Sequence, residues 1–290
     1  MTSTAKSKKI LFPTDFSDAA QNAFEYTLQL AAEWGATVEL LHVVYPQLEA
    51  LDYPVFVSRA TQELVDTSRE VLQSFIAKGQ AAVQGRLAGE VDLLTDIEVG
   101  LPERSIVEVA RRDSIDLIVM GSRGENRTLV EKWLGSTSLG VIEKAHCPVM
   151  VIPLRAVYEK LRRIAYATDG HAADAFEIWE SLQLFKAGPQ VCIDLVHVNT
   201  KPRGDDQAWK RMEQVAEFLR SQTNAPQVEL HHLAGRSIAE ALNTYVGTHP
   251  VDCLVMYRAY HDVWDRLFRQ SQTRRMAWKT QVPLLIQKEN

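Results

Sequence analysis

The chain has 290 residues, of which 46% are hydrophobic and 24% are charged, and its formal net charge is −5 at pH 7. These values are typical of an ordinary globular protein of one or two domains, and the negative charge argues against a nucleic-acid-binding protein. The sequence has no run of about eighteen apolar residues, so no membrane-spanning helix is predicted. The basic start leads into ILFPTDF, which is too short for the apolar core of a signal peptide, and a cytoplasmic location is expected.

The first half alternates short apolar runs with longer amphipathic segments. Two of the runs are apolar almost throughout, as expected of strands that helices cover on both faces. The predicted strands are Ile10–Pro13, Val38–Val44, Val91–Val99, Leu117–Met120 and Val149–Ile152.

Four helices are predicted between these strands. The first has apolar residues at helical spacing, with Ser17 as its N-cap and Gly35 just beyond its end. The predicted helices are Asp18–Trp34, 60–85, Glu103–Arg112 and Ser136–Lys144. Because βαβ crossovers are right-handed, this order predicts a parallel, doubly wound α/β sheet of five strands with helices on both faces.

The second half repeats the first. KKILFPTDFSDAA is matched by RRIAYATDGHAAD, which aligns Asp15 with Asp169, and VELLHVV is matched by IDLVHVN, which aligns His42 with His197. Three further segments match in the same order, so chance is a poor explanation. Because His42 recurs in both halves, we expect it to pack or form a hydrogen bond rather than to act in catalysis.

The repeat predicts two domains of the same fold, residues 1–153 and 154–290, with the stretch Leu154–Arg163 as a stiff connection. The last strand of each half, VMVIP or PLLIQ, is an apolar edge strand that an isolated domain would expose. We expect these two strands to pair within one chain, as an intramolecular pseudo-dimer. A further homodimer stays an open alternative.

The three cysteines, Cys147, Cys192 and Cys253, are widely spaced in apolar segments and form no CxxC pair. Such spacing argues against a disulfide framework and against a zinc site. They are expected to be buried thiols, and no metal ligand is predicted.

The segment GSRGENRTLVEKWLGSTSLG follows the fourth predicted strand and leads into the fourth helix. A helix N-terminus offers free N–H groups and a partial positive charge, and glycine lets the backbone approach an anion. The alternative is that Gly121 relieves a tight turn and Ser136 caps the helix. The residues expected to bind an anion here are Gly121, Arg123, Gly124, Gly135, Ser136, Thr137 and Ser138.

The motif PTDFS places Pro13, Thr14 and Asp15 at the end of the first strand, beside the point where the strand order reverses and ligands bind in such sheets. The Asp15 carboxylate can accept hydrogen bonds from ribose hydroxyls or an adenine amine. Capping of the first helix is the alternative role of Asp15.

PTDFS, LLHVV and the glycine-rich segment, followed by a last strand with proline, resemble a tandem universal stress protein. The resemblance implies a fold related to adenine nucleotide α-hydrolases and, in one branch of the family, ATP binding by G-x2-G-x9-G-[ST]. It implies that Asp15 and the backbone around Val43 hold the adenosine. It also implies a phosphate site made by Gly121, Gly124, Gly135, Ser136 and Ser138. This chain departs from the pattern, because ten residues separate Gly124 from Gly135.

In the second half, Tyr257, Tyr260 and Gln270 stand opposite the three glycines. Bulky side chains keep the backbone away from a phosphate, so we expect a second domain that does not bind nucleotide. A fold that accepts these replacements is expected not to need the glycines for its architecture, and their presence in the first half therefore favours a ligand.

The leading hypothesis is a regulatory stress-response protein that binds ATP, ADP or AMP, with or without Mg²⁺, in its first domain. The alternatives are a slow Mg²⁺-dependent ATPase, which needs few protein groups, and a nucleotide-free scaffold for protein partners. The chain lacks HIGH and SGGxDS motifs, and no catalytic residue is assigned.

Overall fold

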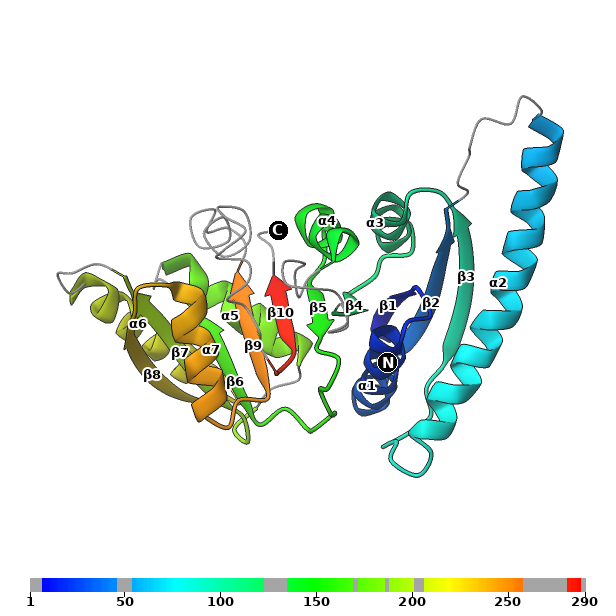
Figure 1. The fold of residues 1–290 in the computed structure, drawn as a ribbon. Coiled ribbons are helices and arrows are strands. Elements are labelled where there is room, and N and C mark those ends of the chain that lie inside the picture. The colour runs from blue at the N-terminus through cyan, green and yellow to red at the C-terminus, as the bar shows by residue number, and fades with distance from the viewer. Residues whose placement is uncertain are drawn as a thin grey trace, which may run out of the picture. The chain divides into compact units, whose positions relative to one another are not determined.

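The computed structural model divides into two compact units, the first ending at Tyr158 and the second beginning at Glu159. Each unit is a parallel sheet with helices packed against it (Figure 1). The residues that the structure describes are 7–45, 54–122, 135–168, 172–185, 188–200, 206–257 and 281–287.

The first unit alternates strands and helices in the predicted order. Its strands are β1 (Lys9–Thr14), β2 (Thr37–Val44), β3 (Leu93–Val99), β4 (Leu117–Gly121) and β5 (Val149–Ile152). Its helices are α1 (Asp18–Trp34), α2 (Pro54–Ala82), α3 (Pro102–Arg112) and α4 (Ser136–Lys144). The bounds of α1, α4 and β5 are those predicted. Helix α2 begins at Pro54 rather than at residue 60, because the first turn of a helix accepts a proline that lacks an N–H.

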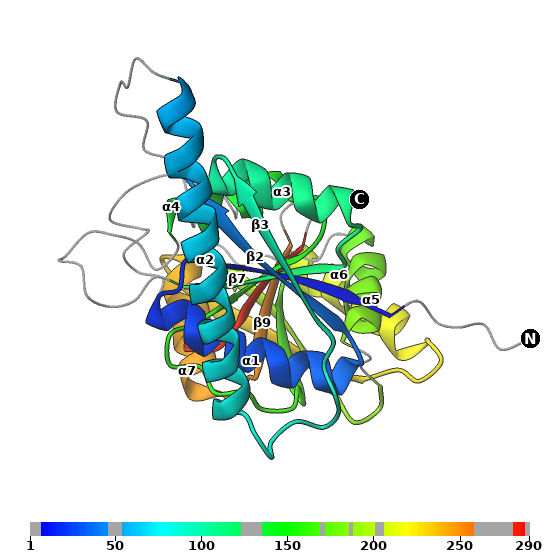
Figure 2. The same ribbon diagram turned by 90° about the vertical axis from the view of Figure 1, so that its right-hand side faces the viewer.

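The strands of this unit are all parallel, in the order β3-β2-β1-β4-β5. From β1 the chain adds β2 and then β3 on one side of β1, and it then crosses over to form β4 and β5 on the other side. Right-handed crossovers therefore place α1 and α2 on one face of the sheet and α3 and α4 on the other (Figures 1 and 2). The order reverses between β1 and β4, which makes the carboxyl ends of these two strands the expected ligand edge.

The ends of α1 are fixed as predicted. The Ser17 hydroxyl oxygen accepts a hydrogen bond from the backbone N–H of Ala20 at 3.2 Å, so Ser17 is the N-cap. At the other end, Gly35 has a left-handed backbone with φ of 61°, and its N–H donates to the Ala31 carbonyl. These two residues determine where α1 begins and ends.

The second unit has the same strand order. Its strands are β6 (Arg163–Ala167), β7 (Cys192–Asn199), β8 (Gln227–Ala234), β9 (Cys253–Tyr257) and β10 (Leu284–Gln287). Among the described residues of this unit, the helices are α5 (Ala172–Leu184), α6 (Asp206–Arg220) and α7 (Ile238–Thr248). The strands lie parallel in the order β10-β9-β6-β7-β8. The predicted doubly wound fold is thus confirmed in both halves.

The repeated histidines make the same hydrogen bond in each unit. His42 Nδ1 lies 2.9 Å from the Thr14 carbonyl oxygen, and His197 Nδ1 lies 3.0 Å from that of Thr168. Because a carbonyl oxygen only accepts, Nδ1 carries the proton in both rings. This bond ties neighbouring strands together, which confirms the hydrogen-bonding role predicted for His42.

Cys147, Cys192 and Cys253 are buried and free, as predicted. Within the described residues, no helix combines the length and the apolar character needed to cross a membrane.

Candidate functional site

The predicted site residues come together at one edge of the first sheet. Pro13 and Thr14 are the last two residues of β1, and Asp15 follows directly; Gly121 is the last residue of β4, which pairs with β1. Val43 on β2 lies next to His42, which is in register with Thr14. The carboxyl ends of β1, β2 and β4 therefore meet at the switch point.

Local hydrogen bonds hold Asp15 at this edge. Its Oδ1 accepts from the backbone N–H of Ser17 at 3.1 Å, and the Thr14 hydroxyl accepts from the N–H of Phe16 at 3.0 Å. The N-cap of α1 is Ser17. The alternative that Asp15 caps the helix is therefore wrong, and its carboxylate is an exposed group held beside the helix N-terminus.

Phe16 is a site residue that the sequence reasoning missed. Its φ is +62°, a left-handed conformation that is strained for a bulky side chain. The ring stacks on His42, with centroids 4.3 Å apart, and meets Phe75 of α2 edge-on at 5.8 Å. These contacts fix the turn that carries Asp15. Nothing local in PTDFS signals the left-handed backbone, because aromatic residues seldom adopt it.

Gly121 has a packing role that corrects one sequence expectation. A Cβ on residue 121 would lie 2.7 Å from the carbonyl oxygen of Ala19 and 3.1 Å from the nitrogen of Ala20. Both atoms are backbone of the first turn of α1, and neither can move without shifting the helix. In the first unit the architecture therefore does require a glycine here, although Tyr257 ends the corresponding strand β9.

Helix α4 begins with an N-cap that has no side chain. Gly135 is this cap, with φ of −64° and ψ of 162°, and no side-chain hydrogen bond caps the helix. The alternative that Ser136 is the cap is therefore wrong. Ser136 is exposed, Thr137 is half-buried and Ser138 is 5% exposed. Backbone N–H groups of the first turn that lack a side-chain acceptor make a helix N-terminus suited to an anion.

Helix α4 is held in place by α3. Gly140 on α4 faces Glu103, which occupies the space that a side chain on residue 140 would take. The Glu103 carboxylate forms an ion pair with Lys144 in the last turn of α4. Since α4 follows a parallel strand, its N-terminus lies at the edge where β4 ends. Arg123 and Gly124, predicted to contact phosphate, lie outside the described residues.

The corresponding edge of the second sheet is lined differently. The rings of His197 and His232 lie 5.3 Å apart, and Trp209 of α6 stacks on His232 at 6.4 Å. Aromatic rings from α6, β7 and β8 thus gather at this edge. Asp169, the counterpart of Asp15 in the repeat, lies outside the described residues.

Comparisons with known proteins identify a family that this chain resembles. The sequence model of the universal stress protein family matches residues 6–153. Universal stress protein MJ0531 of Methanocaldococcus jannaschii is 35% identical over 150 residues, which are 50% of this chain and 81% of that protein. Universal stress protein Slr1230 of Synechocystis is 24% identical over 295 residues, covering 96% of this chain and 99% of that protein.

The likeness extends to a solved structure. A universal stress protein from Archaeoglobus fulgidus covers 99% of this chain and 100% of its own, with a TM-score of 0.72 at 19% identity, which shows a shared fold. The segment that the family model matches contains every strand from β1 to β5 and the whole edge described above. This chain therefore belongs to the universal stress protein family.

Proposed function

We propose that the first unit binds an adenine nucleotide, ATP, ADP or AMP, and that the protein is a regulatory binding module of the stress response. The observation that carries the proposal is the pairing of two complementary groups at one sheet edge. Asp15 is a hydrogen-bond acceptor for ribose or adenine, and the start of α4, which no side chain caps, offers N–H donors for phosphates.

The geometry of the edge supports this assignment of roles. Asp15 is exposed and already oriented by the Ser17 N–H, so binding costs little side-chain entropy. Ser136 is exposed at the first position of α4, where its hydroxyl can join the backbone donors. Val43, near the end of β2, would present its backbone to the adenosine, as the family resemblance implies.

We propose that the second unit does not bind nucleotide. In the sequence repeat, glycine is replaced by Tyr257, Tyr260 and Gln270, and the rings of His232 and Trp209 stack at the same edge. Tyrosine and glutamine do not let a backbone approach a phosphate as closely as glycine does.

Mg²⁺ would accompany a triphosphate, which supplies its oxygen ligands. Hydrolysis is an alternative outcome and does not follow from binding. It would be detected as release of inorganic phosphate from bound ATP above the rate of free ATP.

The proposal is tested by identifying what the purified full chain binds. The protein would be denatured and the released small molecules identified by mass spectrometry, followed by equilibrium titration with ATP, ADP and AMP. One adenine nucleotide per chain is expected. No binding would support the scaffold alternative, and two equivalents would contradict the proposed inactive second unit.

The last strands of the two units are proposed to pair within one chain, because each is an apolar edge. A monomeric mass in solution at low concentration is the expected result. Obligate dimers by light scattering would instead favour pairing between chains.

A further inference from the structure

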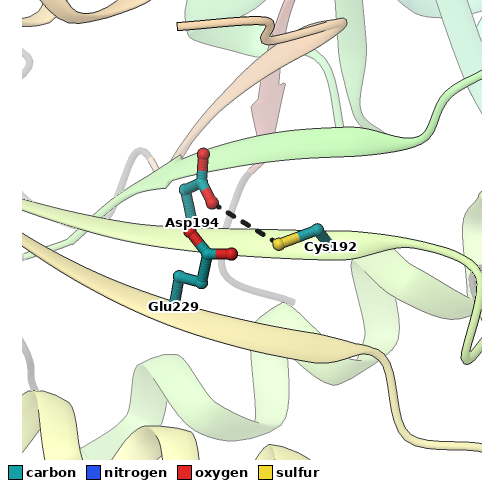
Figure 3. A group of neighbouring side chains, drawn as sticks. All are labelled: Cys192, Asp194 and Glu229. Carbon is teal, nitrogen blue, oxygen red and sulfur yellow. Dashed lines mark hydrogen bonds between the residues drawn. The ribbon is translucent and has the colours of Figure 1, made fainter.

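Four side chains with metal-binding chemistry converge at the other edge of the second sheet, where the strands begin. Cys192 and Asp194 are two residues apart on β7, so they point to the same face. Glu229 and His231 are likewise two apart on β8, and Glu229 is in register with Asp194. Figure 3 shows the thiol and the two carboxylates turned toward one another.

Three separations between ligand atoms in this cluster match those of ligands that share an ion, and the thiol and the two carboxylates lie within 4.8 Å of one another. Cys192 Sγ lies 3.6 Å from Asp194 Oδ1, and His231 Nε2 lies 3.6 Å from both Asp194 Oδ1 and Glu229 Oε2. Metal–ligand bonds of about 2.0–2.3 Å in a tetrahedral zinc site place neighbouring ligand atoms roughly 3.3–3.8 Å apart. A distance of 3.6 Å from nitrogen to oxygen is too long for a hydrogen bond.

Burial makes the arrangement costly without an occupant. The Asp194 side chain is fully buried and Cys192 is 8% exposed. The Nε2 atom of His231 is also buried, and it has no hydrogen-bond partner among the residues that the structure describes. A buried polar atom without a partner needs an explanation, and here it faces two carboxylates.

The cluster already binds a cationic group. Arg163 Nη1 lies 2.7 Å from Asp194 Oδ1 and 3.0 Å from Glu229 Oε2, the same two oxygens that face His231. Arg163 is at the start of β6, and its side chain is 25% exposed. Its guanidinium can therefore move into solvent without unfolding the sheet.

We propose that Cys192, Asp194, Glu229 and His231 form a site for a transition-metal ion, with Zn²⁺ as the best match, and that Arg163 occupies the cation position in the metal-free protein. Thiolate and imidazole ligands select Zn²⁺ over Mg²⁺ and Ca²⁺. On binding, the metal takes the position of the guanidinium, and the Cys192 thiol loses its proton to solvent.

A neighbouring tyrosine orients one of the proposed ligands. The Tyr245 hydroxyl donates to Asp194 Oδ2 at 2.8 Å, which turns the other oxygen toward the site. Zn²⁺ binds the thiolate, so metal binding releases the proton of the Cys192 thiol.

The first unit lacks this donor set. The corresponding register positions hold Thr37, Glu39, Leu94 and Asp96, which provide carboxylates but no sulfur or imidazole. Asp96 is paired there with Arg112 at 2.9 Å. The absence of CxxC in the sequence predicted no zinc site, because that rule does not detect ligands that alternate along two paired strands.

The test uses the full chain, stripped of metal with a chelator and titrated with Zn²⁺ against a chromophoric competitor. One equivalent is expected, and Co²⁺ should give the near-ultraviolet charge-transfer band of a cobalt–thiolate bond. Cys192→Ser should abolish this band and weaken Zn²⁺ binding by more than about 100-fold. Cys253→Ser, which changes another buried thiol at the start of a strand, should leave both unchanged.

Arg163→Gln separates a metal site from a purely structural cluster, because it removes the competing cation and should tighten Zn²⁺ binding. Weaker binding in this variant, binding that Cys192→Ser leaves unchanged, or no thiolate band in the unaltered protein would overturn the proposal. The cobalt–thiolate band is measured on the unaltered protein, so the test does not depend on whether a variant folds. The site is independent of nucleotide binding, and the two proposals stand or fall separately.

Discussion

Gly121, at the end of β4, packs directly on the backbone of Ala19 in α1, where a Cβ on residue 121 would lie 2.7 Å from the Ala19 carbonyl oxygen. Gly121→Ala must therefore push α1 away from β4. Overpacking of this kind costs about 1–3 kcal/mol, and we expect that loss in the free energy of unfolding measured with urea. An unchanged stability would show that α1 does not depend on this contact.

Gly135 differs from Gly121, because its φ of −64° suits any residue. Gly135→Ala should change the free energy of unfolding by less than about 1 kcal/mol. A methyl group at the start of α4 should still lower the affinity for ATP at least about tenfold, which calorimetry would measure.

The matched control is Gly247→Ala on α7, where a Cβ meets no atom within 4 Å. It should raise helix stability by about 0.5–1 kcal/mol and leave ATP affinity unchanged. Equal ATP affinities for the two variants would show that the start of α4 does not contact the phosphates.

Phe16 combines a strained backbone with stacking on His42. Phe16→Ala removes the stacking and keeps the strain, whereas Phe16→Gly removes both. The glycine variant should therefore be the more stable of the two by about 1 kcal/mol, the reverse of the usual order. Urea unfolding of the pair tests this, and an alanine variant at least as stable as glycine would contradict the strain.

Glu39 on β2 makes stability depend on pH. Burial, and then the charges of Asp113 and Asp96, raise its pKa above the ordinary value of 4.5, although Arg112 and Lys9 oppose the shift. The folded state thus binds the Glu39 proton more tightly than the unfolded state. The stability gained from this is present below that ordinary value and is lost as the pH rises through the folded-state pKa.

Glu39→Gln keeps the size of the side chain and removes its charge. Relative to the unaltered protein, the variant should gain stability between about pH 4 and about pH 7, measured by urea unfolding at both. If the stability advantage of the variant shrinks as the pH rises, the result contradicts a raised pKa of Glu39.

Much of the fold follows from local pattern. The bounds of α1 were predicted because Ser17 and Gly35 mark its two ends, and β5 was predicted as Val149–Ile152 because strands covered on both faces are continuously apolar. The repeat predicted that both units share one strand order, and the matched bonds of His42 and His197 agree with it.

The remaining features depend on contacts between segments far apart in the chain. The need for glycine at position 121 arises from the first turn of α1, about a hundred residues earlier. The left-handed backbone of Phe16 is imposed by packing on β2 and α2. The meeting of Cys192 with His231 requires the register of β7 with β8, which no motif in the sequence encodes.

The central claim is a single nucleotide site at the end of β1, and calorimetric titration of ATP into the full chain tests it most directly. Asp15→Asn keeps an oxygen for the Ser17 N–H but loses the charge, while Asp169→Asn changes the counterpart residue in the repeat. One equivalent of ATP should bind to the unaltered protein and to Asp169→Asn, with affinity at least about tenfold lower in Asp15→Asn. Equal affinities in the two variants, or a greater loss in Asp169→Asn, would contradict the account.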